Sequence, residues 1–223
     1  VVRENKKQIK SVIVASSDKA YGHYPKHKLP YKEDYELKAE FPYDTSKACA
    51  DMITRSYSNK LFNLPIIITR FANIYGPGQL NFTAIIPEAI RCCLLNKKFI
   101  FRSDGLSIRD FIYIDDITDL YKLLAKNLYI NPKKFSGEIF NAGTNTQHQM
   151  KDIIEKIFIH GKRKIELKSI FRRIKNNKTT GEISSQYMDY DKLNTYLGWY
   201  PKRKFINTLP SLFKWYKRYF KKK

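Results

Sequence analysis

The chain has 223 residues, enough to bury a core in one large domain or two small ones. Its formal net charge is +21, but Lys outnumbers Arg 31 to 11, whereas nucleic-acid binders favour Arg among stacking aromatic residues. We therefore expect solvated Lys faces rather than a nucleic-acid partner.

The sequence also argues against membrane, disulfide and metal chemistry. It has no apolar run of about 18 residues, the length that a membrane helix needs. Its three cysteines, Cys49, Cys92 and Cys93, have neither metal-ligand spacing nor an even number for a disulfide framework. We expect a soluble cytoplasmic protein that binds no metal.

The charged segment 1–10 is predicted to be the end of a helix that leads into a strand. Residues 11–16 form a short apolar run rich in β-branched side chains, typical of a buried parallel strand. Its end delivers Ser17, Asp18 and Lys19, and ligands of open α/β sheets bind beyond the carboxyl ends of strands. The charged, proline-containing loop 22–42 that follows can close over such a site.

A helix is predicted over 44–63, with Asp44 capping its start. Tyr43 and Lys47 are four residues apart, a spacing that places two side chains on one helical face. A positive charge beside a phenol lowers the pKa of that phenol, which then becomes a base near neutral pH. The spacing alone is also compatible with a surface helix carrying an exposed lysine.

The rest of the chain continues as alternating strands and helices. Turn residues over 73–78 interrupt the pattern, Asp115 and Asp116 are expected to cap a helix, and the lysine-rich stretch 161–178 is expected to be a flexible insertion. The predicted strands cover 64–71, 99–101 and 137–143, and the predicted helices 85–96, 116–127, 147–159 and parts of 191–220.

Four motifs in a fixed order carry a resemblance to a known family. They read VIVASSDKAYG, PYDTSKACADMI, LPIIITRFANIYGPGQ and SIRDFIYIDD. With them the chain resembles the extended short-chain dehydrogenase/reductase family, specifically its NAD-dependent nucleotide-sugar epimerases and 4,6-dehydratases, from about residue 9 to about residue 215.

The resemblance implies the C-terminal part of a doubly wound Rossmann-type parallel sheet with a small α/β substrate lobe. Residues 1–80 would be the C-terminal portion of the NAD-binding domain, and 81–223 mainly the substrate-binding lobe with interleaved Rossmann elements. Members of the family begin with a GxxGxxG turn that cradles the dinucleotide pyrophosphate, and this sequence has no such turn. We therefore expect an N-terminally truncated chain.

The resemblance also implies roles for individual residues. Tyr43 would take the proton of the sugar 4-hydroxyl, Lys47 would bond the ribose of NAD, and Ser17 would bond the same hydroxyl. Ala72 would contact the nicotinamide through its backbone, while Asn73 and Arg109 would bind the diphosphate of the nucleotide sugar. Ala84 stands where relatives often carry a polar substrate contact, which leaves the base of the nucleotide open.

Asp18 and Lys19 favour a dehydratase over an epimerase. In the related dehydratases an acid at the position of Asp18 protonates the leaving 6-hydroxyl, and Lys19 resembles the Asp-Lys pair of CDP-glucose 4,6-dehydratases. A 4-epimerase would use Ser17, Tyr43 and Lys47 without these two, and Asp18 with Lys19 would then form only a local ion pair. A non-catalytic fragment acting as a basic binding module is the third reading. The resemblance further implies a homodimer formed through the helix that carries Tyr43.

Overall fold

In the computed structural model the chain forms an α/β fold, described for residues 1–101, 103–174 and 183–221. The strands are β1 (Val12–Ser17), β2 (Ile66–Phe71), β3 (Asn73–Tyr75), β4 (Ile108–Arg109), β5 (Phe111–Tyr113), β6 (Ile139–Ala142), β7 (His148–Gln149) and β8 (Ser185–Gln186). The α-helices are α1 (Pro42–Ser58), α2 (Ile85–Leu94), α3 (Ile114–Ile130), α4 (Pro132–Phe135), α5 (Met150–His160), α6 (Leu167–Ile174), α7 (Asp191–Leu197) and α8 (Phe205–Lys221). Three 3-10 turns join them: η1 (Asp18–Tyr21), η2 (Lys26–Lys28) and η3 (Lys164–Glu166).

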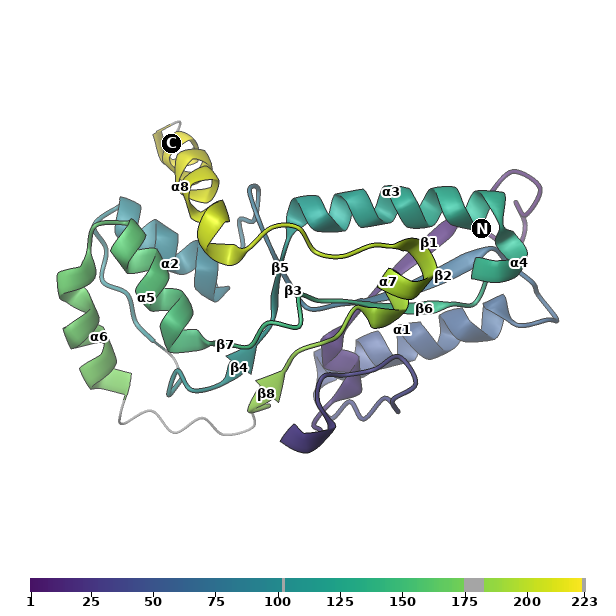
Figure 1. The fold of residues 1–223 in the computed structure, drawn as a ribbon, viewed down its shortest axis with the longest axis horizontal. Helices are drawn as coiled ribbons and strands as arrows, with labels where there is room; N and C mark the ends of the chain where they lie inside the picture. The colour runs from purple at the N-terminus through teal and green to yellow at the C-terminus, as the bar shows by residue number, and fades with distance from the viewer. Residues whose placement is uncertain (102, 175–182, 222–223) are drawn as a thin grey trace.

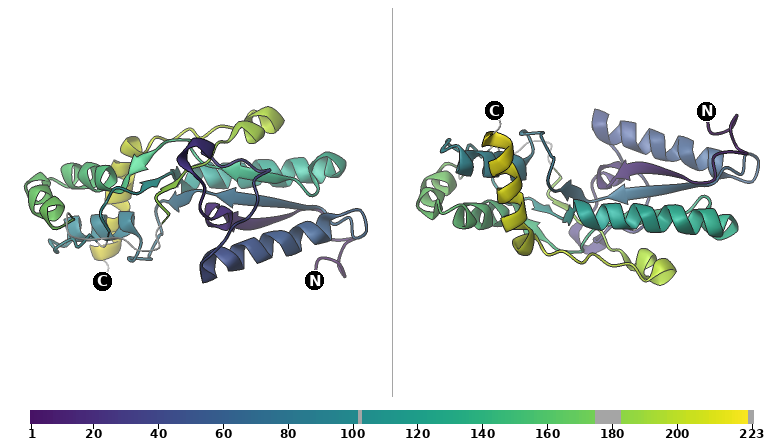
Figure 2. Two further views of the ribbon diagram at one scale, coloured as in Figure 1. Left: turned by 90° about the horizontal axis from the view of Figure 1, so that it is seen from below. Right: turned by 90° about the horizontal axis from the view of Figure 1, so that it is seen from above.

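The main sheet is parallel, in the order β1-β2-β6. All six residues of β2 are buried, as expected of a central strand whose two faces are covered by helices. Helices α1 and α3 lie on opposite faces of the sheet, and both contact β1 and β2 (Figures 1 and 2). The predicted Rossmann-like parallel sheet is thus confirmed.

A second group of short strands adjoins the main sheet. The pair β3-β5 is parallel, and a small mixed sheet follows in the order β7-β4-β8. Helices α2, α5, α6 and α8 gather at the opposite end of the molecule from α1 and α3 (Figure 1).

Two apolar clusters correspond to these two ends. One joins the sheet to α3 and includes Ile67, Leu124 and Phe140, each 0% exposed. The other fills the space between α2, α5 and α8 and includes Ile90, Ile154 and Leu212, each 0% exposed. The elements between the clusters, β3, β4 and β5, therefore lie where a ligand can touch both halves.

Several sequence predictions are corrected by the structure. Segment 1–10 forms turns instead of a helix end, residues 99–101 form no strand, and Asn73–Tyr75 is a strand instead of a turn. The predicted flexible insertion is folded over 161–174, where α6 docks through Leu167 and Ile170, both buried; residues 175–178 lie outside the described residues.

Two capping predictions are also wrong. Helix α1 begins at Pro42, because proline is suited to a first helical position, and its N-cap is Phe41. Asp44 instead lies buried in the first turn. On α3, Asp116 does not cap its own helix but accepts hydrogen bonds from the backbone N–H groups of Lys202 and Arg203, anchoring the segment before α8.

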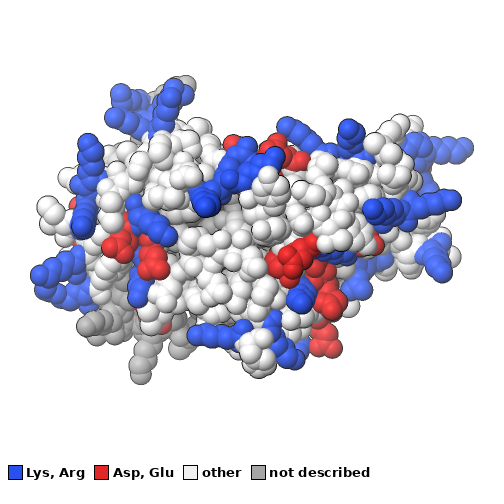
Figure 3. Space-filling model, viewed as in Figure 1, with Lys and Arg blue, Asp and Glu red and all other residues white. Residues whose placement is uncertain are grey.

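Lysine and arginine side chains are distributed over much of the surface shown in Figure 3, including the end of α8, with acidic groups between them. No helix in the described part of the chain is both long enough and apolar enough to span a membrane.

Candidate active site

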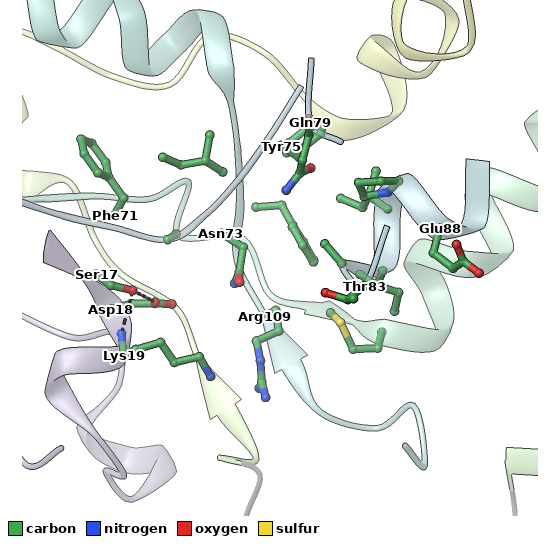
Figure 4. A pocket seen from close by; sticks show the side chains of 18 of the residues that line it. Ser17, Asp18, Lys19, Phe71, Asn73, Tyr75, Gln79, Thr83, Glu88 and Arg109 are labelled. Carbon is green, nitrogen blue, oxygen red and sulfur yellow. Dashed lines mark hydrogen bonds between the residues drawn. The ribbon is translucent and has the colours of Figure 1, made fainter. Parts of the chain in front are cut away.

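The eight residues predicted to form the site all line one cavity of about 870 Å³. The cavity extends from the carboxyl ends of β1 and β2 to helix α2 and the segment 98–103. Figure 4 shows Ser17, Asp18 and Lys19 on one side of it and Arg109 across from them. The sheet topology therefore brings together motifs that are up to 92 residues apart in sequence, from Ser17 to Arg109.

The Ser17–Lys19 segment is held in a tight local structure. The Ser17 hydroxyl accepts a hydrogen bond from the Lys19 backbone N–H at 3.2 Å and donates one to Asp18 Oδ1 at 3.0 Å. Gly22 ends the turn with φ of +68°, and a Cβ there would lie 1.9 Å from the Lys38 carbonyl oxygen, so only glycine fits. The turn fixes Asp18 and Lys19 just beyond the carboxyl end of β1.

Asp18 is 2% exposed, and its Oδ2 atom has no hydrogen-bond partner among the described residues. Burial raises the pKa of this carboxyl above its usual value, although the neighbouring Lys19, the Ser17 hydroxyl and Arg109 act in the opposite direction. Burial thus shifts Asp18 towards its protonated form, the form that can donate a proton.

The start of α1 is tied to the end of β1. The Lys47 ammonium donates a hydrogen bond to the Ala15 carbonyl at 3.4 Å, and the Ser16 hydroxyl donates to the Lys47 carbonyl at 3.4 Å. Lys47 Nζ lies 5.9 Å from the centre of the Tyr43 ring, so the two side chains are neighbours as the helical spacing predicts. The Tyr43 side chain is 57% exposed and therefore accessible at the edge of the cavity.

A buried ion pair behind α1 is missed by the sequence analysis. Arg70 of β2 donates to Asp51 of α1 through Nε at 2.8 Å and through Nη2 at 3.0 Å, and both side chains are 0% exposed. Arg70 also donates to the Tyr21 hydroxyl at 2.8 Å. The sequence signal is an arginine inside the apolar run LPIIITRF, where an unpaired charge would be too costly to bury.

The diphosphate candidates Asn73 and Arg109 are positioned by β3 and β4. The Asn73 backbone and side-chain N–H groups both donate to the Asp110 carbonyl at 3.1 Å. Arg109 is 5% exposed, and its Nη1 donates to the Ile108 carbonyl at 2.8 Å. Ala72 follows β2 directly and is 3% exposed. Because its side chain is small, the backbone of this segment lies close to the cavity.

Asp110 is a second group that the sequence analysis misses. Its carboxylate accepts hydrogen bonds from the Thr144 hydroxyl, the Thr144 N–H and the Asn145 N–H, which fixes the loop after β6. Burial raises the pKa of Asp110 to about 6, although these hydrogen bonds lower it. The clue in the sequence is the Arg109-Asp110 pair, of which only the arginine was assigned a role.

The lobe side of the cavity contains mostly apolar and small residues. Thr83, Ala84, Pro87 and Glu88 contribute from α2 and the segment before it. Glu88 is paired with Arg91 at 2.6 Å one turn further along the helix. Within the described residues, no group of three or more His, Cys, Asp or Glu side chains could hold a metal ion.

The comparisons with known proteins identify the family. The model of the "NAD dependent epimerase/dehydratase family" matches residues 1–143. The chain belongs to this family. The resemblance inferred from the four motifs is thereby confirmed.

Relatives in this family carry dehydratase names. The chain is 39% identical over 116 residues, 52% of its length, to a dTDP-D-glucose 4,6-dehydratase of Dictyostelium discoideum, of which the match spans 25%. It is 26% identical over 95% of its length to a mouse protein of the same name, covering 57% of that protein. The chain therefore spans between a quarter and three fifths of these two relatives.

A solved structure confirms the fold. The dTDP-glucose 4,6-dehydratase of Bacillus anthracis in complex with NAD superposes with a TM-score of 0.80 at 26% identity, covering 97% of this chain and 65% of that one. The family is NAD-dependent by its description, in agreement with the predicted cofactor.

The residues of the cavity fit one end of NAD. A phenol at Tyr43, an ammonium at Lys47 and a small residue at Ala72 stand at the ends of adjacent elements, a donor set suited to the nicotinamide and its ribose. The GxxGxxG turn that holds a pyrophosphate has no counterpart in the sequence. The residues of the cavity therefore fit the nicotinamide end of NAD.

Proposed function

We propose that this chain carries the proton-transfer and substrate-binding part of an NAD-dependent 4,6-dehydratase, which converts a nucleoside-diphosphate hexose to the 4-keto-6-deoxy sugar. The family and the names of the relatives support nucleotide-sugar modification. The cavity supports it as well, because the proposed proton-transfer groups and a buried arginine suited to a diphosphate line the same cavity.

NAD, when bound, would supply the acceptor for hydride from C4 of the sugar and later return that hydride to C6. Tyr43 would accept the proton of the 4-hydroxyl, with Lys47 beside it and the Ser17 hydroxyl bonding the same oxygen. The resulting 4-keto group acidifies the hydrogen at C5. Asp18 would protonate the departing 6-hydroxyl as water, and Lys19 is the proposed base at C5.

The burial of Asp18 is the observation that carries the dehydratase proposal. Elimination of a hydroxyl needs a proton donor, and burial of Asp18 raises the pKa of its carboxyl, which favours the proton-bearing form. A 4-epimerase needs no such acid. The epimerase is the runner-up, supported by Tyr43, Lys47 and Ser17 alone.

Asn73 and Arg109 are the proposed contacts to the diphosphate. The planar guanidinium of Arg109 suits a doubly charged group, and its burial strengthens the attraction. We propose that residues 81–223, as mainly the substrate lobe, receive the nucleotide, while 1–80 belong to the NAD-binding domain. CDP-, dTDP- and UDP-glucose are the candidate substrates.

A homodimer through α1 is also proposed. The helix buries Asp44, Ala48 and Asp51 against the sheet, whereas Met52 and Ile53 on another face are 61% and 58% exposed. Exposed apolar side chains on one helix suit a contact with the same helix of a second copy. Sedimentation of a Met52→Glu/Ile53→Lys variant tests this: a monomer is expected, and an unchanged dimer would contradict it.

The natural protein that carries this chain should be incubated with NAD and each of the three nucleotide sugars, and the products analysed by mass. Loss of one water from one substrate is expected. Interconversion without a change in mass would instead establish an epimerase, and no product from any substrate would contradict both.

Asp18→Asn then tests the assignment of the acid. Overall dehydration should fall about 10²–10⁴-fold, while oxidation at C4, followed by the absorbance of reduced cofactor, remains detectable. Asp34→Asn is the matched control, because Asp34 is exposed and does not line the cavity. Equal loss of both steps in the Asp18 variant would contradict its role.

A further inference from the structure

A hydrogen bond at Lys19 connects the main-sheet side of the cavity to the small sheet, whose strand β4 carries Arg109. The Lys19 ammonium donates to the side-chain oxygen of Gln186 at 2.5 Å, across 167 positions of sequence. Lys19 belongs to the turn after β1 of the main sheet, and Gln186 to β8 of the small sheet. The sequence analysis assigned no role to Gln186.

The environment of Gln186 fixes which end of its amide faces Lys19. The residue is 0% exposed, and its Nε2 atom has no hydrogen-bond partner among the described residues. An ammonium can only donate, so the amide oxygen must face Lys19. Reversing the amide would place donor against donor, so the buried side chain has one favourable orientation.

The backbone of Gln186 is equally constrained. In the parallel pairing of β4 with β8, Gln186 lies opposite Arg109, and its carbonyl accepts the Asp110 N–H at 3.1 Å. A movement of Gln186 would therefore disturb the strand that carries the proposed diphosphate ligand.

Lys19 needs such a partner because its side chain is long and lies near carboxylates. Asp18 and Asp44 both interact electrostatically with Lys19, so two carboxyl groups compete with Gln186 for its ammonium. A lysine side chain also carries about 2 kcal/mol of rotamer entropy, which a single well-placed acceptor helps to offset. A neutral buried amide can orient the ammonium without adding a further negative charge.

We propose that Gln186 is the positioning residue for Lys19: its side-chain oxygen holds the ammonium at the cavity wall, in line with the β4 strand that carries Arg109. The mechanistic part of this inference rests on the proposed dehydratase function. The contact itself does not, so the two can be tested separately.

The contact is tested by the chemical reactivity of Lys19. Reductive methylation of the whole chain, followed by peptide mass mapping, measures how fast each lysine is modified. In Gln186→Met, which keeps the length of the side chain but removes the acceptor, Lys19 should react about tenfold faster, since hydrogen bonds to charged groups are typically worth a factor of this size or more. Gln186→Glu restores an acceptor and should restore the slow rate.

Two controls show that the effect is local. Lys192 is bonded to the Ile139 carbonyl at 2.8 Å and to Glu138 at 2.6 Å, so its methylation rate should not change. Gln149→Met makes the same substitution on β7, the other neighbour of β4, and should leave Lys19 slow. An unchanged Lys19 rate in Gln186→Met, or a rise of Lys19 and Lys192 together, would overturn the proposal.

The mechanistic part is tested by solvent deuterium exchange at C5 in the enzyme that dehydrates its sugar. Gln186→Met should slow kcat for this step with little change in KM, and adding Gln186→Met to Lys19→Met should slow it no further. A multiplicative loss in the double variant would mean that Gln186 acts independently of Lys19 and would overturn the positioning role. If no nucleotide sugar reacts with the wild-type protein, the proposed function fails, while the methylation rates still decide the contact.

Discussion

The buried pair of Arg70 and Asp51 should be the most sensitive electrostatic element of the chain. Two charged side chains with 0% exposure are joined by hydrogen bonds of 2.8 and 3.0 Å, and Arg70 makes further bonds to Tyr21 and to the Glu33 carbonyl. Asp51→Asn removes the negative charge at constant shape. It leaves the guanidinium with its charge buried and uncompensated.

The expected loss of unfolding free energy is about 3–5 kcal/mol, the usual cost of breaking a buried pair by removing one partner. A domain is typically stable by only about 5–15 kcal/mol, so this variant would lose about a fifth or more of its stability. At roughly 2–4 °C per kcal/mol for a chain of this size, Tm should fall by about 10 °C.

Urea unfolding of the chain followed by circular dichroism measures this loss. Arg70→Met should cost a similar amount, whereas the double variant Arg70→Met/Asp51→Leu should cost clearly less than the sum, because no charge is left buried. Glu36→Gln is the control: its pair with Lys38 at 3.4 Å is exposed, and the change should stay within about 0.5 kcal/mol. A loss below about 1 kcal/mol in Asp51→Asn, or strict additivity in the double variant, would refute the reasoning.

Three further predictions concern glycine, pH and thiols. Gly22→Ala should destabilise the chain by at least about 2 kcal/mol more than Gly198→Ala, because both have positive φ but only the first Cβ meets backbone; equal melting temperatures would contradict this. Asp110 has a pKa raised from 3.8 to about 6, so its contribution to stability is full below pH 3.8 and is lost as pH rises through 6. Between these values the free energy of unfolding should fall by about 1.4 kcal/mol per pH unit. Urea titrations should show a smaller slope in Asp110→Asn, and an identical pH dependence in the two proteins would be contrary evidence. Exposed Cys49 should react with a disulfide reagent well before Cys92, whose thiol is buried and has a pKa raised to about 11; the reverse order in peptide mapping would contradict the burial.

The sequence was sufficient for those features of the site that local motifs encode. Strand ends deliver Ser17 and Ala72, and a helical i, i+4 spacing pairs Tyr43 with Lys47, so their meeting in one cavity follows from a parallel sheet. The placement of Ser17, Tyr43 and Lys47 depends on periodicity and chain order, whereas that of Ala72 was implied by the family resemblance. For these residues the structure adds mainly how deeply each side chain is buried.

Features that depend on partners far apart in sequence could not be predicted in this way. Asp51 occupies a sheet-facing position of α1 where periodicity favours an apolar residue, and only the position of Arg70 on β2 explains it. Gln186 lies in a two-residue strand, too short to give any periodic signal, and its partner Lys19 is at the other end of the chain. Long-range polar contacts of this kind leave single residues in the sequence without a pattern around them.

The position of the ion pair on α1 has a consequence for the site. Tyr43, Lys47 and Asp51 follow one another at intervals of four residues, so they lie along one slowly turning face of the helix. Asp51 anchors that face to β2, while the Lys47 ammonium reaches the Ala15 carbonyl at the end of β1. A rotation of α1 about its axis would break both contacts together. By fixing the rotation of α1, the buried pair of Arg70 and Asp51 makes Tyr43 and Lys47 face the cavity. The same constraint directs the exposed apolar side chains of Met52 and Ile53 away from the sheet.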